Sequence, residues 1–258
     1  PDFHIHTGFS DDSTEKPENT MESAVRMGMP AVCITDHLDM NTPDGSFAFD
    51  QDVYFKELTL LKDKYADRIE VCIGVELGFG LADPALYLQG RPYEHVIGSM
   101  HYVERADPYL REQVPLSDEE MYRQYFEDLL CMIRDSDAFQ TVGHLDYIAR
   151  YGYDGGKGCT YAAYRELLDA ILDEIIRRGL ILEINTAGFR KPSARPNPSA
   201  EILEIYRKMG GDRVILGSDA HDAAGVGGFF DRAGEMLRQI GFTHLTLPGR
   251  KGEREIPL

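Results

Sequence analysis

The chain has 258 residues, of which 43% are hydrophobic and 28% are charged, a balance typical of a soluble globular protein. Its 44 acidic residues outnumber 27 basic ones, and the net charge of −17 argues against binding to nucleic acid or to an anionic membrane surface. No apolar run approaches the ~20 residues that cross a bilayer, and no signal segment is visible, so we expect neither insertion nor export.

Apolar, β-branched segments alternate with amphipathic helical segments along the whole chain. The strands are predicted near residues 2–6, 31–35, 69–75, 94–100, 140–144, 180–185 and 213–217. The helices are predicted near residues 18–28, 51–66, 117–133, 160–178, 198–209 and 229–240. This alternation indicates βα units and a parallel sheet, and seven strands suggest a closed or nearly closed α/β barrel. With no linker-like tract, we expect a single domain over residues 1–258.

The cysteines point to a reducing compartment. Cys33, Cys72, Cys131 and Cys159 show no Cys-x-x-Cys spacing and lie in apolar or helical contexts. This pattern favours structural thiols in a cytoplasmic protein.

The first predicted strand carries His4 and His6, two residues apart. Because side chains alternate along a strand, both imidazoles project to the same side, where they can grip one transition metal ion. Asp12 follows six residues after His6, in a Gly/Ser/Asp-rich loop that can fold back over the strand end. Taken alone, the pair is equally compatible with two unrelated histidines.

Further histidines and carboxylates fall where the later strands end. These are His37 after strand two, Glu76 at strand three, His101 at strand four, His144 at strand five, and Asp219 with His221 at strand seven. Barrel enzymes assemble their chemistry at this end of the strands. A single histidine after a strand is usually a loop or core residue, but six histidines with three carboxylates on one rim indicate a site. His95 and His244 lie outside the pattern, and we assign them structural roles, although His95 could still approach the rim.

So many ligands suit a cluster of two or three ions rather than one tetrahedral metal. Imidazole with carboxylate favours Zn, Mn or Fe over Ca or Mg alone. Glu76 can bridge two ions held ~3.5–4 Å apart, a spacing characteristic of sites that hydrolyse phosphoesters. Such ions lower the pKa of a bound water toward neutrality and stabilise the leaving alkoxide.

Strand six ends differently, in a Gly-containing loop with Arg190 and Lys191. A forked guanidinium at the rim can hold two phosphate oxygens. Arg150, six residues after His144, is a second candidate for substrate binding. The alternative for each is a solvated loop cation, and for Arg150 the two interpretations are evenly balanced.

The order of these motifs resembles the PHP (polymerase and histidinol phosphatase) superfamily over nearly the whole chain. The motifs are His4-x-His6 with Asp12, Thr35-Asp36-His37, Glu76, Gly98-Ser99-Met100-His101, Gly143-His144 and Ser218-Asp219-Ala220-His221. The stretches 143–150 and 185–191 are most similar to the monofunctional histidinol-phosphate phosphatases.

The resemblance implies a distorted (β/α)7 TIM-like barrel with a trinuclear metal centre at the C-terminal ends of the strands. One ion would take His4, His6, Glu76 and Asp219; a second would share Glu76 and add His101 and His144; a third would take Asp12, His37 and His221. Many relatives have a histidine at the position of Asp12, which leaves the identity and occupancy of the third ion open. Asp2, Asp36 and Asp146 would orient ligand imidazoles, or else serve as loop and helix-start residues.

The implied activity is that of a metal-dependent phosphomonoesterase of histidine biosynthesis, which cleaves L-histidinol phosphate to L-histidinol and phosphate through a metal-bridging hydroxide. Glu76, Asp219, His221 and Arg190 would be the catalytic residues, and no phosphoenzyme is expected. Three alternatives stay open: another small phosphomonoester such as a nucleotide or sugar phosphate, metal-assisted amide or lactone hydrolysis, and a module acting on nucleic acid, which the negative charge disfavours.

Overall fold

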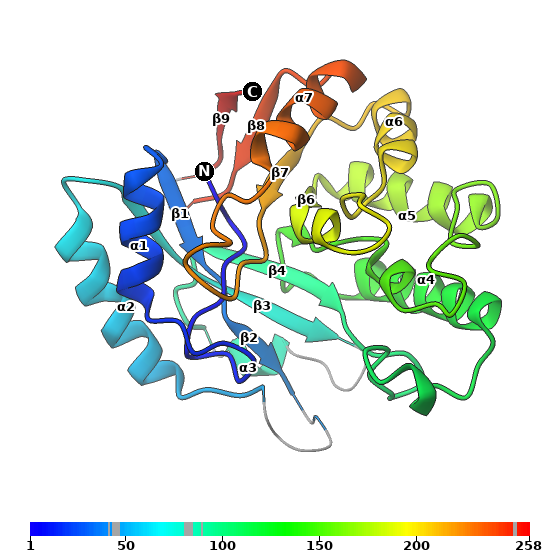
Figure 1. The fold of residues 1–258 in the computed structure, drawn as a ribbon, viewed down its shortest axis with the longest axis horizontal. Helices are drawn as coiled ribbons and strands as arrows, with labels where there is room; N and C mark the ends of the chain where they lie inside the picture. The colour runs from blue at the N-terminus through cyan, green and yellow to red at the C-terminus, as the bar shows by residue number, and fades with distance from the viewer. Residues whose placement is uncertain (41, 43–46, 80–84, 89, 250–251) are drawn as a thin grey trace.

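A parallel sheet forms the centre of the computed structural model, which describes residues 1–40, 42, 47–79, 85–88, 90–249 and 252–258. Its strands follow the order β1-β3-β4-β5-β6-β7, and β2 also pairs with β3 (Figure 1). The bounds are β1 Ala31–Ile34, β2 His37–Asp39, β3 Glu70–Phe79, β4 His95–Met100, β5 Thr141–Val142, β6 Ile181–Asn185 and β7 Val214–Gly217. Every pairing in this sheet is parallel, as the alternation of strands and helices predicts.

Residues 2–6 lie between the two edges of this sheet, β1 and β7. Phe3 N donates to Leu216 O at 3.2 Å on one side, and Thr35 N donates to Ile5 O at 2.8 Å on the other. A continuous strand was predicted here, but only isolated bridges form, Asp2 with Val32 and Ile5 with Ala220. One reason is that Ile5 N donates to the side chain of Thr35 instead of to a neighbouring backbone. The segment nevertheless closes the sheet, which gives the distorted seven-stranded barrel expected from the sequence.

The helices flank this barrel. They are α1 Pro17–Arg26, α2 Gln51–Tyr65, α3 Ala85–Leu88, α4 Asp118–Asp135, α5 Arg165–Arg178, α6 Ala200–Lys208 and α7 Phe230–Ile240. Figure 1 shows α1 and α2 on one side, α4 and α5 on the other, and α6 and α7 near β7. The capping box of Ser117 and Glu120 begins α4, and Gly179, at φ 64°, ends α5. The prediction started α5 too early, because residues 161–164 form a turn before the helix.

Two strands near the C-terminus were not predicted. β8 His244–Leu247 and β9 Arg254–Pro257 pair as an antiparallel hairpin beside β7. Each has only four residues, too short for a clear periodicity in the sequence. In the part of the chain that the structure describes, no helix combines the length and the apolar character needed to span a bilayer.

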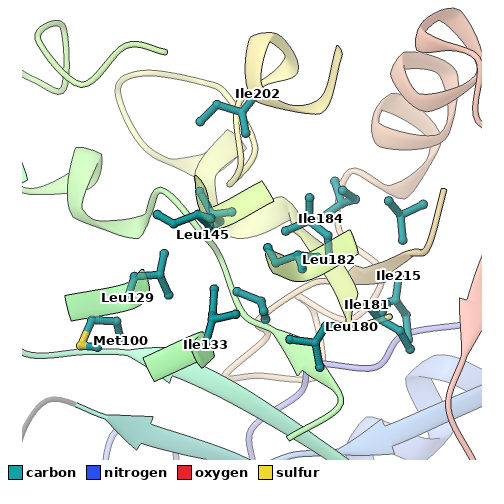
Figure 2. Packing of buried hydrophobic residues seen from close by; sticks show 14 of the residues in the cluster. Met100, Leu129, Ile133, Leu145, Leu180, Ile181, Leu182, Ile184, Ile202 and Ile215 are labelled. Atoms are coloured by element: carbon teal, nitrogen blue, oxygen red, sulfur yellow. The ribbon is translucent and has the colours of Figure 1, made fainter. Parts of the chain in front are cut away.

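The core fills the space between the sheet and the helices and keeps the rim rigid. Figure 2 shows Leu182 and Ile184 of β6 side by side, with Leu129 of α4 and Ile202 of α6 at other points of the same buried apolar cluster. His95 belongs to this interior: it is fully buried, and its Nε2 lies 2.9 Å from Thr141 Oγ1. Burial lowers the pKa of His95 to about 3, so the ring is neutral. The structural role expected for His95 is therefore confirmed.

Candidate metal centre

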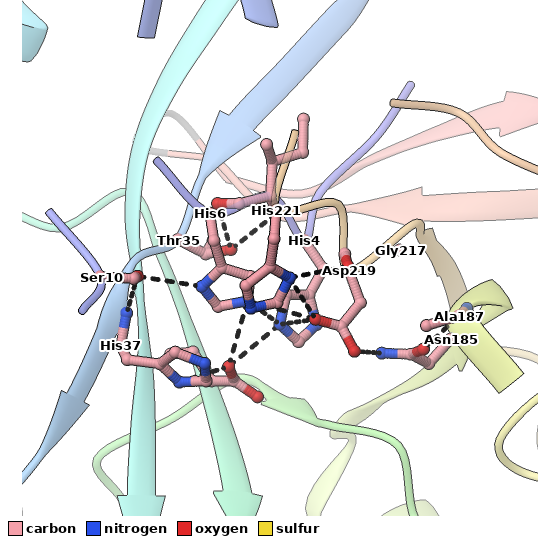
Figure 3. A network of polar contacts seen from close by, with 12 residues as sticks. His4, His6, Ser10, Thr35, His37, Asn185, Ala187, Gly217, Asp219 and His221 are labelled. Carbon is pink, nitrogen blue, oxygen red and sulfur yellow. Dashed lines mark hydrogen bonds and ion pairs between the residues drawn. The ribbon is translucent and has the colours of Figure 1, made fainter. Parts of the chain in front are cut away.

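The predicted ligand residues meet at the carboxyl end of the barrel, with His4 and His6 at their centre. The Nε2 atoms of these two histidines are 3.0 Å apart. Glu76 Oε2 lies 3.1 Å from His4 Nε2 and 3.4 Å from His6 Nε2, and Asp219 Oδ1 lies 3.3 Å from His6 Nε2. Figure 3 shows Asp219 and the histidine rings pointing toward one another from separate segments. These four residues are the set predicted for the first ion.

Carboxylates behind the two rings determine which nitrogen carries the proton. Glu183 Oε1 accepts from His4 Nδ1 at 2.5 Å. Ser10 Oγ donates to Asp36 Oδ1 at 2.8 Å, so it must accept from His6 Nδ1, 3.2 Å away. Both imidazoles therefore hold their proton on Nδ1 and direct the Nε2 lone pair into the cluster.

Glu76 connects this first group to a second one through its other oxygen. Glu76 Oε1 lies 3.0 Å from His144 Nε2 and 3.3 Å from His101 Nε2, and it accepts from Ser99 Oγ at 2.6 Å. Asp39 Oδ2 accepts from His101 Nδ1 at 2.6 Å, which again leaves Nε2 free to bind. The arrangement is that predicted for two ions sharing one carboxylate.

The third predicted group lies nearer to solvent. Asp12 Oδ2 is 3.0 Å from His221 Nε2 and 3.7 Å from His37 Nε2. The side chains of Asp12 and His221 are 42% and 32% exposed, whereas that of Glu76 is 1% exposed. His37 Nδ1 also approaches Glu76 Oε2 at 3.0 Å, so this ring borders both groups.

The donors fit divalent transition metal ions. Burial alone would raise the pKa values of Glu76 and Asp219, but the positive charge of protonated histidines around them, His4 foremost, holds both well below their usual range. Both carboxylates are therefore ionised, and metal ions would take the place of the protons on those histidines. Glu76 Oε2 is buried and receives no hydrogen bond from the described residues, and it faces imidazole lone pairs. Such a concentration of lone pairs and negative charge is stable only around cations, and the mixture of imidazole and carboxylate suits zinc, manganese or iron.

A cavity of about 710 Å³ opens above this cluster, and the three predicted substrate-binding cations line it. Arg150 Nε donates to Asn197 Oδ1 and Nη2 to Asn185 Oδ1, at 2.8 and 2.9 Å. With a side chain only 6% exposed, Arg150 is a built part of the site and not a solvated loop cation. Arg190 Nη2 donates to the backbone oxygens of Ser218 and Asp219 at 3.0 and 3.2 Å.

The aspartates predicted to orient ligand imidazoles have other contacts. Asp36 acts on His6 only through Ser10. Asp2 accepts from the backbone of Ser218 and Gly227, and Asp146 accepts from Asn197 and Ser199. For Asp2 and Asp146, the loop role is thus the one observed.

The carboxylates that accept from the Nδ1 atoms of ligand histidines, Glu183 and Asp39, were not predicted from the sequence. The signal for Glu183 was present in the sequence, because a charged residue stands within the apolar run Ile181-Leu-Glu-Ile-Asn185. Asp39 gave no such signal, since it lies in a short strand that was not predicted.

Comparisons with known proteins agree with this geometry. The PHP domain family matches residues 2–187. The histidinol-phosphatase of Lactococcus lactis is 31% identical over 256 residues, which cover 97% of this chain and 95% of that protein. A probable histidinol-phosphatase of Clostridium acetobutylicum is 32% identical over 241 residues, 91% of each chain. The crystal structure of the L. lactis histidinol phosphate phosphatase, complexed with zinc, L-histidinol and phosphate, superposes with a TM-score of 0.88 at 28% identity over 98% of both chains.

Proposed function

The chain belongs to the PHP domain family, and from this premise we propose that it hydrolyses L-histidinol phosphate to L-histidinol and phosphate. It is then a phosphoric monoester hydrolase of histidine biosynthesis. The observation that carries the proposal is the shared carboxylate of Glu76, whose two oxygens face two separate groups of imidazoles. Paired metal sites of this kind are suited to displacement at phosphorus.

We assign zinc, or another divalent transition metal, to the three ligand groups in the partition predicted above. Support for zinc comes from the L. lactis structure, which contains that metal. When bound, the ions supply Lewis acidity, which favours ionisation of water near pH 7 and stabilises charge on the phosphoryl and leaving oxygens.

The protein's own groups position the substrate and the ligands. Arg190, fixed to the backbone oxygens of Ser218 and Asp219, directs its guanidinium toward the cavity and binds the phosphoryl oxygens. Lys191 adds charge to the same wall, while Arg150 lies 3.6 Å from Asp219 Oδ2 and balances that carboxylate. Glu76, Asp219 and His221 act as ligands next to the reacting group. Because this scheme uses no side-chain nucleophile, no phosphorylated enzyme forms.

We further propose that residues 1–258 form one domain and that the enzyme works in the cytoplasm. A small phosphomonoester is its binding partner. The excess of acidic residues, with a net charge of −17, disfavours nucleic acid as a substrate.

Metal analysis of the purified protein, followed by a screen of phosphomonoesters, tests the proposal. We expect two to three divalent ions per chain and a kcat/KM for L-histidinol phosphate at least tenfold above those for nucleoside monophosphates and sugar phosphates. A metal-loaded enzyme that prefers a nucleotide or a sugar phosphate contradicts the assigned substrate and favours a sister phosphatase.

A further inference from the structure

One wall of the site cavity is aromatic and leads away from the metal ligands. Ring centroids are 4.6 Å apart between His144 and Tyr147, 5.0 Å between Tyr147 and Tyr151, and 6.2 Å between Tyr151 and Tyr109. All three tyrosines line the cavity, and Tyr109, at 70% exposure, marks its mouth. The rings form a continuous series from a metal ligand to solvent.

This series is held in place by polar contacts. Tyr151 donates its hydroxyl hydrogen to the hydroxyl of Tyr147 at 2.8 Å. The guanidinium of Arg150 lies 5.0 Å from the ring of Tyr147, so the inner tyrosine already has a cation against it. Tyr151 and Tyr109 lie farther out along the wall, where their ring faces can contact a bound ligand.

A carboxylate lies at this outer part of the wall. Asp107 lines the cavity, and its Oδ1 accepts from the backbone N–H of Tyr109 at 2.8 Å. Burial raises the pKa of Tyr151, and the negative charge of Asp107 adds to that rise, as it does for Tyr147.

We propose that Asp107, Tyr109 and Tyr151 form a subsite for the cationic, ring-bearing organic group of the phosphomonoester. Aromatic faces stack on flat heterocycles and attract cations, and a carboxylate pairs with an ammonium group. The cavity then has a positive end at Arg190 and Lys191 and a negative end at Asp107. This inference rests on the proposed function and deepens it: L-histidinol phosphate carries a primary ammonium and an imidazole, whereas a sugar phosphate has no cation for Asp107.

The test compares two substrates of the metal-loaded, full-length protein. The variant Asp107→Asn removes the charge but keeps an oxygen that can accept from Tyr109 N–H, so the loop is preserved. We expect kcat/KM for L-histidinol phosphate to fall about tenfold, mainly through KM, because a charge-assisted contact is lost. Hydrolysis of p-nitrophenyl phosphate, whose organic group is neutral, stays unchanged. The matched control Glu112→Gln removes one charge from the neighbouring turn and should leave kcat/KM for both substrates unchanged.

Calorimetric titration with L-histidinol gives a readout independent of turnover. Asp107→Asn and Tyr151→Leu should each weaken the Kd about tenfold, whereas Tyr151→Phe, which keeps the ring, should weaken it much less. Equal losses on both substrates, or unchanged kinetics and Kd for Asp107→Asn, overturn the subsite and leave the proposed function standing. A wild-type enzyme that hydrolyses p-nitrophenyl phosphate but neither cleaves L-histidinol phosphate nor binds L-histidinol overturns both.

Discussion

Glu183 Oε1 lies 2.5 Å from His4 Nδ1, and the same carboxylate accepts from the backbone N–H of His144 at 2.6 Å through Oε2. One buried side chain of β6 therefore positions both His4, which we assign to the first ion, and the strand end that carries His144, which we assign to the second. Glu183 is 1% exposed, so neither contact is loosened by competing water.

The variant Glu183→Gln should weaken metal binding without unfolding the protein. A neutral amide orients His4 less firmly and makes its imidazole less basic, and changes behind a ligand typically cost about 10–100-fold in metal affinity. Competition with a chromophoric chelator measures the affinity. The control Glu174→Gln alters a largely buried carboxylate of α5 that pairs with Arg177, and should leave metal affinity as in the wild type.

Arg190→Ala should lower kcat/KM for the phosphomonoester about 100-fold, because a preorganised cation at the phosphoryl group is lost. Metal content should stay constant, since the hydrogen bonds of Arg190 to the ligand loop go to the backbone oxygens of Ser218 and Asp219 and not to ligand side chains. Steady-state kinetics together with metal analysis check both expectations. Unchanged turnover of the phosphomonoester would contradict the role of Arg190 in binding the phosphoryl group.

The third proposed ion, which we assign to Asp12, His37 and His221, should leave first when a chelator is added. Its ligands are the more exposed ones, with Asp12 at 42% and His221 at 32%, and water competes there more effectively. Asp12→Ala should accordingly reduce the metal content by about one ion per chain while the two inner groups stay loaded. Time-resolved metal release monitors this order; simultaneous loss of all ions would contradict it.

His95 should make the folded state less stable in mild acid. Its pKa is about 3 in the folded protein, below the unfolded value of 6.5, because burial disfavours the charged ring. The free energy of unfolding is unaffected by this shift above pH 6.5 and decreases as the pH falls toward 3. At pH 5 the decrease amounts to about 2 kcal/mol. Denaturant unfolding of metal-free wild type and His95→Gln at pH 7 and pH 5 measures it. Between pH 7 and pH 5, the free energy of unfolding should fall by about 2 kcal/mol less in His95→Gln than in the wild type. Equal decreases in the two proteins would refute a lowered pKa for His95.

The sequence predicts well the order of strands and helices and the clustering of the proposed ligand residues, because both follow from local patterns. Most of the proposed ligands stand at the end of an apolar β-branched run, and parallel strands bring those ends to one rim. The positions of Arg190 and Lys191 at the cavity follow in the same way from the loop after β6.

What the sequence does not predict depends on contacts between distant segments. Asp39 reaches His101 across 62 positions, and Glu183 reaches His4 across 179, so no local spacing relates them. The aromatic wall is hidden for the same reason, since Tyr109 and Tyr151 meet only in the folded chain. The hairpin of β8 and β9 packs beside β7, and its short strands show no sequence periodicity from which it could be predicted.

Residues 2–6 both seal the barrel and supply His4 and His6 to the metal centre. During synthesis this segment cannot complete its pairing until residues 214–219 have been made, so the seam is among the last parts of the sheet to form. An ion bound by both His4 and Asp219 would link the two sides of that seam, in addition to the backbone hydrogen bonds that close it. Depriving a growing cell of the metal would then cost the enzyme both its activity and this extra link, and the closed barrel would resist proteases less well.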